Sequence, residues 1–313
     1  MIEISKKSKI YIAGHHGLVG SGLVRHFKDN GFTNLILRSR RELDLNSKQD
    51  VSDFFKKEQP EYVILAAAKV GGIAANIASP VDFLIENIQI QNNVLLACHQ
   101  YNVKKIIFLG SSCIYPRESP QPMQENSFMQ GPLEPTNESY AIAKITGIRL
   151  AQSLHQQFGL NIICPMPSNV YGTGDHFEFE RSHVLSALVR RFIEAKRNNS
   201  ESLTLWGTGG ARREFLHVDD LAAACLFLLY NYDSPEIINV GTGEDITIKT
   251  AAEIIAGLVG YCGKLNWDLS KPDGMPRKLL DVSRIHSLGW HHKISINDGI
   301  VSVINDFNER FPI

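Results

Sequence analysis

The first half of the chain alternates short, almost continuously apolar runs with longer segments in which apolar residues recur at helical spacing. Such runs are typical of parallel strands that helices cover on both faces. We expect strands at Lys9–Gly14, Asn34–Ser39, Tyr62–Ala68, Lys105–Ser111 and Asn161–Pro165. We expect helices at Leu18–Asn30, Ser47–Glu58, Val81–Tyr101 and Tyr140–Phe158. This alternation predicts an α/β fold with a Rossmann-type doubly wound parallel sheet.

The second half of the chain is less regular. We expect helices at Ser182–Asn198 and Val218–Leu229, and strands at Ser202–Trp206 and Ile237–Gly241. The change in pattern predicts that residues 1–168 form the Rossmann-type domain and that residues 214–241 return to it. Residues 169–313 are then expected to form mainly a smaller C-terminal α/β lobe.

Charge and hydropathy narrow the class of protein. The 313 residues include 32 Lys and Arg against 33 Asp and Glu, which leaves a formal charge of −1. This balance argues against nucleic-acid binding and against a polybasic membrane-surface protein. We expect no transmembrane helix, because no apolar run approaches about 18 residues. The first residues also lack the pattern of a signal peptide.

The cysteines, five in number, are scattered through the chain without any Cys-x-x-Cys pair. They are Cys98, Cys113, Cys164, Cys225 and Cys262. Neither a disulfide framework nor a structural zinc site fits this spacing. We therefore expect a cytoplasmic protein without a metal site.

A glycine-rich turn follows the first predicted strand directly. Gly14, Gly17 and Gly20 stand at GxxGxxG spacing, and the first predicted helix begins within the motif. Three glycines alone could be an ordinary turn. Between a strand and a helix, however, they allow the backbone to approach a pyrophosphate at the helix N-terminus.

The end of the second predicted strand indicates which dinucleotide binds. An NAD site usually places an acidic residue there for the ribose hydroxyls. This chain has Arg38 and Arg40 instead, and the first acid is Glu42. A guanidinium binds a 2′-phosphate with two charge-assisted hydrogen bonds, so NADP is favoured over NAD. The alternative is an exposed basic turn.

A tyrosine and a lysine share one helix face in Tyr140-Ala-Ile-Ala-Lys144. Ser111 lies at the carboxyl end of a predicted strand, where open α/β sheets bind ligands. A ketone reductase needs an acid for the developing alkoxide. Tyr140 can serve if the Lys144 ammonium lowers its pKa and the Ser111 hydroxyl holds the carbonyl oxygen.

The combination of loop, serine and Tyr-x-x-x-Lys resembles the extended short-chain dehydrogenase/reductase superfamily. Further stretches are similar to one family within it, the GDP-L-fucose synthases. They are Ala66–Ile73, Leu109–Pro116, Leu133–Lys144, Arg213–Asp220 and Ser270–Asp281. The resemblance extends from Ile10 to about Trp290.

The resemblance implies an NADPH-dependent conversion of GDP-4-keto-6-deoxy-D-mannose to GDP-L-fucose, by 3,5-epimerisation and then hydride reduction of the C4 ketone. It makes Ser111, Tyr140 and Lys144 the reductase triad, and Cys113 and His183 the base and acid of epimerisation. It places NADP(H) against Gly14, His15, His16, Gly17, Leu18, Val19, Gly20, Arg38, Arg40, Leu109, Gly110, Ser112, Lys144, Pro167, Ser168, Asn169, Val170 and His183. It places the GDP-sugar against Arg191, Trp206, Arg213, Asp273 and Lys278.

Several of these residues have a plain structural alternative. A cysteine is more often a small core residue than a catalytic one, although Cys113 stands two residues after Ser111. His183 titrates near neutral pH, which suits proton return, but it could be a structural histidine. The arginine pairs could be surface ion pairs, above all at Arg190, Arg212 and Arg277.

The predicted cofactor site departs from the family pattern at two positions, and three other functions are alternatives. The glycine loop has His16 where the family typically carries an arginine for the NADP phosphate, and Ser168 replaces the usual threonine. The first alternative function is a C4-only reductase of a related GDP-6-deoxy-4-keto sugar. The second is a nucleotide-sugar dehydratase or 4-epimerase with tightly held NAD⁺. The third is a non-catalytic nucleotide-binding protein.

The resemblance also implies a homodimer, formed through the predicted helices Val81–Tyr101 and Tyr140–Phe158.

Overall fold

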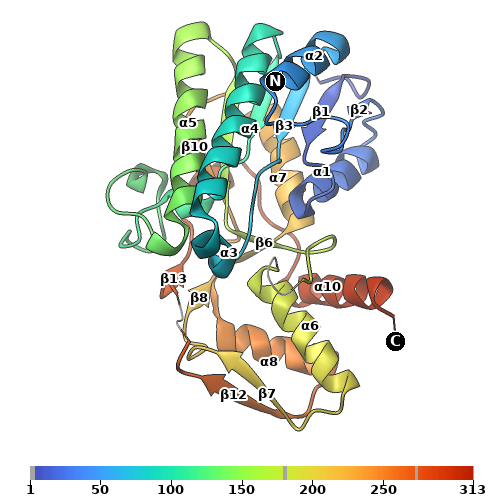
Figure 1. Cartoon of the computed structure of the whole chain (residues 1–313), viewed down its shortest axis with the longest axis vertical. Coiled ribbons are helices and arrows are strands. Elements are labelled where there is room, and N and C mark those ends of the chain that lie inside the picture. Colours follow the sequence, from blue (N-terminus) through green and yellow to red (C-terminus); the bar gives the residue numbers. More distant parts are fainter. Residues whose placement is uncertain (1–3, 179–181, 272–273, 313) are drawn as a thin grey trace.

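The computed structural model describes residues 4–178, 182–271 and 274–312 (Figure 1). Its centre is a parallel sheet with the order β10-β5-β4-β3-β1-β2. The strands are β1 (Ile10–Ala13), β2 (Leu35–Ile36), β3 (Tyr62–Leu65), β4 (Lys105–Phe108), β5 (Ile162–Pro167) and β10 (Ile237–Val240). The predicted α/β fold with a doubly wound sheet is confirmed.

Helices cover both faces of this sheet, which explains why its strands are almost continuously apolar. On one face lie α2 (Lys48–Glu58), α4 (Pro80–Gln100) and α5 (Glu138–Phe158), with α4 and α5 side by side. On the other face α1 (Leu18–Asp29) packs against α7 (Val218–Asn231). The strand order reverses between β1 and β3, and ligands of open α/β sheets bind at such a reversal.

The smaller lobe has its own apolar core. Helices α6 (Val184–Arg197), α8 (Ile248–Val259) and α10 (Ile296–Arg310) pack around Phe192, Ile255 and Val303. Short strands pair as β7 (Ser202–Trp206) with β12 (Lys264–Asp268), and as β6 (Asn169–Tyr171) with β9 (Phe215–His217). The remaining strands form the order β11-β8-β13, namely Ile246–Thr247, Arg212–Arg213 and Arg277–Lys278.

Short helices complete the architecture. They are α3 (Ile73–Ala78), α9 (Ser283–Ser287) and the 3₁₀ turns Ser112–Ile114, Glu125–Ser127 and Pro135–Asn137. Among the helices in the described ranges, none is long and apolar enough to cross a membrane. The expected division at residue 168, with 214–241 returning, stays a prediction.

Strand β10 forms one edge of the main sheet. Side chains from other segments form hydrogen bonds with backbone groups on its outer side. The Asn239 N–H donates to Glu125 Oε1 at 3.0 Å. The Ile237 carbonyl accepts from Arg284 Nη1 at 2.8 Å. Arg284 and Glu125 also form an ion pair at 3.8 Å. Two hydrogen-bonding groups on this edge of β10 are therefore already taken by side chains.

Candidate active site

A cavity of about 810 Å³ opens at the carboxyl ends of the main strands. Every residue that the sequence assigns to the dinucleotide lines it, from the glycine loop to Val170. Ser111, Cys113, Tyr140, Lys144 and His183 line the same cavity. The structure thus brings together residues separated by up to about 170 positions in the chain.

The glycine loop fits closely against the strand beside it. Gly14 has φ +85°, a conformation that favours glycine, and a Cβ there would lie 2.7 Å from the backbone nitrogen of Ala67. A Cβ on Gly20 would overlap the Gly14 carbonyl. Larger residues would therefore push the loop away from the sheet and close the space in front of it.

The N-terminus of α1 is suited to an anion. Gly17 precedes this helix. Among the described residues, no side chain caps the helix, and its first turn contains no acidic residue. Buried polar atoms without a partner among the described residues also line the cavity, including His15 Nδ1 and Ser168 Oγ. Free helix N–H groups and unpaired polar atoms fit the phosphates of a dinucleotide.

The two arginines that the sequence proposes for a 2′-phosphate differ in their surroundings. Arg38 is held by Glu58 at 2.6 Å and lies over the Phe54 ring. The Arg40 side chain is 76% exposed and approaches Glu86 at 3.8 Å. Arg40 is therefore the freer of the two to bind a phosphate at the cavity mouth.

The three residues predicted as a reductase triad lie together where β4 meets α5. The Ser111 hydroxyl accepts from the Cys113 N–H at 3.3 Å, at the first turn after the strand. Lys144 is buried, and its Nζ donates to the Leu109 carbonyl at 2.8 Å. The same Nζ lies 5.9 Å from the centre of the Tyr140 ring. Side chains from a strand end and a helix thus converge on one point.

Burial governs the proton affinities here. It raises the pKa of the Tyr140 phenol, reinforced by Cys113 and opposed by a hydrogen bond with Ser111. It lowers the pKa of Lys144 to about 8. Desolvation thus dominates the pKa of Tyr140, and the lowering of that pKa by Lys144 stays a prediction. Tyr140 keeps its proton at neutral pH, as a proton donor must.

Cys113 and His183 face the cavity from opposite lobes. Cys113 is buried, which raises its thiol pKa, while Lys278, Ser111 and Lys144 oppose that rise. His183 precedes α6 directly, and its side chain is 42% exposed. Burial alone would lower the His183 pKa, but hydrogen bonding and charge from Asp175 raise it overall. One lobe supplies a thiol and the other a readily protonated imidazole.

The residues proposed for the GDP-sugar lie mainly in the smaller lobe. Lys278 lines the cavity and pairs across β13 and β8 with Arg213. Arg191 donates to the Thr204 carbonyl, near the exposed Trp206 at the end of β7. Arg191, Trp206 and Arg213 are not among the residues that line the cavity. Asp273 lies outside the described residues.

Three other arginines take the structural role that the sequence analysis weighed for them. Arg190 pairs with Glu194 at 2.7 Å on α6. Arg212 and Arg277 share the buried carboxylate of Asp245, at 2.7 and 2.5 Å. These ion pairs tie β8, β11 and β13 together, and Lys278 of β13 lines the cavity.

Comparison with known proteins decides the family. The model for the NAD dependent epimerase/dehydratase family matches residues 10–241, most of the chain. This chain belongs to that family.

Individual members of the NAD dependent epimerase/dehydratase family match almost end to end. The chain is 55% identical to GDP-L-fucose synthase 1 of Arabidopsis thaliana, over 94% of this chain and 91% of the relative. It is 49% identical to the GDP-L-fucose synthase of Escherichia coli K12, over 97% and 98%. A GDP-mannoheptose C4 reductase from Campylobacter jejuni with NADP bound is 40% identical, with a TM-score of 0.89 over 98% and 100%. The resemblance seen in the sequence is confirmed.

Several residues at the site of this protein were not predicted from the sequence. Asn76 and Asn137 line the cavity, and each has a buried Oδ1 without a partner in the described ranges. Glu86 lines its mouth beside Lys69. Asp175 contacts His183 from the preceding loop. A sequence gives little signal for these, except that Asp175 stands in an acidic, histidine-containing loop.

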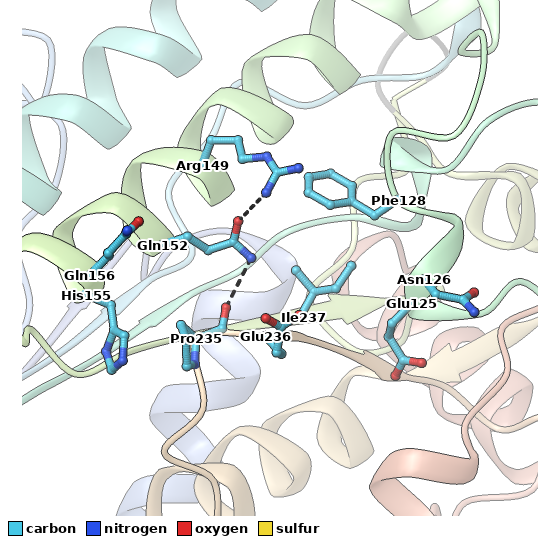
Figure 2. Close-up of a pocket in the computed structure, with 10 residues that line it drawn as sticks. All are labelled: Glu125, Asn126, Phe128, Arg149, Gln152, His155, Gln156, Pro235, Glu236 and Ile237. Carbon is cyan, nitrogen blue, oxygen red and sulfur yellow. Dashed lines mark hydrogen bonds between the residues drawn. The ribbon is translucent and has the colours of Figure 1, made fainter.

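A second cavity, of about 440 Å³, lies beside the edge strand β10 (Figure 2). Gln152 on α5 accepts from Arg149 at 2.9 Å and donates to the Pro235 carbonyl at 3.3 Å. Glu125, which occupies the edge of β10, also lines it. None of the site residues predicted from the sequence lines this cavity.

Proposed function

We propose that this protein converts GDP-4-keto-6-deoxy-D-mannose to GDP-L-fucose in two steps with NADPH. The observation that carries the proposal is the single cavity in which Cys113 and His183 meet the triad Ser111, Tyr140 and Lys144 beside the glycine loop. Identity of 55% and 49% to GDP-L-fucose synthases supports the same substrate. The NADP in the related C4 reductase supports the cofactor.

Epimerisation uses the acidity that the C4 ketone gives to the protons on C3 and C5. Cys113 removes a proton, and the electron pair left on carbon delocalises into an enolate. His183 returns a proton to the opposite face, which inverts that centre. The two residues come from different lobes, which supports attack from two sides. Lys278, whose charge acts on Cys113, favours the thiolate.

Reduction follows at C4, where the bound cofactor supplies the hydride. Tyr140 gives its phenolic proton to the developing alkoxide. The Ser111 hydroxyl holds the carbonyl oxygen, and the Lys144 ammonium stabilises the tyrosinate that remains. Arg40, Gly14, Gly17 and the α1 N-terminus would hold the phosphates.

The GDP portion of the substrate is assigned to the smaller lobe. Trp206 offers an exposed ring on which a guanine can stack. Arg191, Arg213 and Lys278 supply positive charge for the diphosphate. Asp273 stays in the proposed set on the family resemblance alone.

A C4-only reductase is the second candidate, because the related Campylobacter jejuni protein is named as a C4 reductase. Such an enzyme needs the triad but has no use for an epimerisation pair. The presence of Cys113 and His183 in the same cavity favours the two-step reaction.

A homodimer is part of this proposal. Val81, Ile85 and Leu96 on α4 and Ile142 on α5 are exposed apolar residues on two helices that lie side by side. Pairing these helices with those of a second copy would bury them in a four-helix interface. Sedimentation at micromolar concentration should give twice the chain mass; a monomer would contradict the dimer. Free cysteines suit the cytoplasm, where we place the reaction.

The decisive test supplies GDP-4-keto-6-deoxy-D-mannose in D₂O with and without NADPH. The proposal predicts NADPH oxidation, GDP-L-fucose as the product, and deuterium at both C3 and C5. Oxidation of NADPH without deuterium would leave the C4-only reductase. If neither reaction occurs, the proposed substrate is wrong.

A further inference from the structure

Asp175 is a fully buried carboxylate in the loop that leads from β6 toward α6. A buried carboxylate is costly unless hydrogen bonds and opposite charge compensate it. Asp175 lies in the smaller lobe beside His183, and neighbouring hydrogen-bond donors compensate its charge.

Three donors surround this carboxylate. Its Oδ1 accepts from the His176 N–H at 2.8 Å and lies 3.1 Å from His183 Nδ1. Its Oδ2 accepts from the Ser186 hydroxyl at 2.5 Å. A carboxylate only accepts, so the ring nitrogen Nδ1 of His183 must carry the hydrogen. The other ring nitrogen, Nε2, is then the one left for the cavity.

The loop that carries Asp175 is anchored independently of His183. Arg310 on α10 donates to the Asp175 carbonyl at 2.7 Å. The Gly174 N–H donates to Asp306 of the same helix at 3.1 Å, and Arg310 and Asp306 pair with each other. Helix α10 therefore fixes the loop, and the carboxylate can hold the imidazole without moving.

We propose that Asp175 is the positioning residue of the epimerisation acid: it orients His183, fixes Nδ1–H as its own hydrogen-bond donor and directs Nε2 at the sugar carbon. This inference rests on the proposed function. Nothing in the chemistry of Asp175 requires contact with the substrate, because it acts through His183.

His183 gives up one proton and regains one in each turnover. With His183 protonated, its Nε2–H bond breaks as the electron pair of the enolate forms a new C–H bond. The imidazolium becomes neutral, with its hydrogen on Nδ1 facing Asp175. The carboxylate thus stabilises the cation before transfer and retains the required tautomer afterwards. His183 regains a proton from solvent, while Cys113 releases to solvent the one that it removed.

The test is Asp175→Asn, which keeps the shape and removes the charge. Deuterium incorporation from D₂O at the carbon that His183 serves should fall at least about tenfold, a part of the factor of about 10²–10⁴ that a positioned acid contributes in full. NADPH binding, followed by fluorescence, should be unchanged. Loss of the Asp175 charge should also move the alkaline limb of the pH–exchange profile to lower pH, because that charge raises the pKa of His183.

A titration without substrate separates this inference from the proposed function. The ring protons of His183, assigned by their absence in His183→Gln, are followed by NMR in the wild type and in Asp175→Asn. A lower His183 pKa in the variant supports the inference even if the wild type fails to act on the sugar. An unchanged pKa together with unchanged exchange overturns it.

Two control variants test for a merely structural effect. Ser186→Ala removes the bond to Oδ2 but leaves the contact with Nδ1. Asp306→Asn weakens the anchor of the loop on α10. Each should lower thermal stability and leave the midpoint of the pH profile in place; a shifted midpoint in both would contradict a specific role for Asp175. If Asp175→Asn does not fold, Asp175→Glu tests the same proposal. This variant keeps the charge, so the His183 pKa should stay raised, while the longer side chain should slow deuterium exchange.

Discussion

Polar side chains line both the large cavity at the strand ends and the smaller cavity beside β10, yet these side chains differ in their hydrogen-bond partners. In the edge cavity, Gln152 links Arg149 to Pro235, and Glu125 serves the edge of β10 (Figure 2). In the large cavity, buried atoms of His15, Asn137 and Ser168 have no partner among the described residues. Side chains that bond to one another and to the backbone, as Gln152 does, stabilise the fold. A surface with unpaired donors and acceptors is built for a ligand.

Unpaired polar atoms and shifted pKa values therefore indicate a functional cavity better than its volume or polarity does. The large cavity lies at the strand reversal and contains a lysine with a pKa near 8 and a phenol with a raised pKa. Perturbed groups of this kind cluster at functional sites.

The largest effect is expected from Tyr140→Phe. It removes the proton donor for C4, so NADPH oxidation should fall by about 10²–10⁴-fold. The ring that Lys144 faces stays in place, and NADPH should bind as in the wild type. Steady-state absorbance gives the rate and fluorescence titration gives the affinity. Undiminished oxidation would remove Tyr140 from its role and weaken the contrast between the cavities.

Cys113→Ala should come next. Without its thiol the enzyme should lose at least about a hundredfold in deuterium incorporation from D₂O, as expected for loss of a general base. The matched control is Cys225→Ala, since Cys225 is a buried core cysteine in α7. That variant should lose about 1 kcal/mol of stability and keep its exchange rate. Equal losses in both variants would mean that Cys113 acts only through packing.

A smaller effect is expected from pH. As pH rises through about 8, Lys144 loses its proton, and reduction should fall about tenfold for each further unit. The same group affects stability: an unfolded chain would keep this proton until about 10.5. Between these values the unfolded state binds more protons, so the free energy of unfolding should rise with pH.

The matched experiment is Lys144→Met, which keeps the length of the side chain. Thermal unfolding at pH 7.5 and 9.5 should show a smaller gain with pH in the variant than in the wild type. A gain of the same size would assign the effect to other groups.

The smallest effect on catalysis is expected in the edge cavity. Gln152→Ala removes the link between Arg149 and Pro235, and should cost about 0.5–1.5 kcal/mol of stability. Its turnover should stay within about twofold of wild type, a change of under 0.5 kcal/mol in the barrier. Urea unfolding and the NADPH assay measure the two quantities. A large loss of turnover would break the comparison, since it would make the second cavity part of the site.

Sequence reasoning reached the main sheet because parallel strands buried on both faces leave apolar runs that are easy to recognise. It reached the glycine loop because the motif is contiguous. Helices α8 and α10 and the two-residue strands β8, β11 and β13 were not predicted. Strands of that length have no periodicity, and their pairing, which ion pairs at Asp245 support, joins residues far apart in the sequence.

The candidate site was predicted where its residues belong to motifs. The contact between Asp175 and His183 depends on a loop that α10 anchors, more than 120 positions later in the chain. The burial that dominates the pKa of Tyr140 also cannot be deduced from Tyr-x-x-x-Lys spacing. Site roles beyond the cavity lining, and the domain boundary at residue 168, stay predictions.

The occupied edge of β10 has a consequence for the protein in a crowded cell. An open sheet can recruit a strand from a neighbouring molecule and grow into an aggregate. Here Glu125 and Arg284 already hold the Asn239 N–H and the Ile237 carbonyl. A newly made chain that has folded this far therefore offers fewer free backbone groups to a neighbouring strand along that side. The side chains beside the small cavity thus hinder strand addition at the border of the sheet opposite β2.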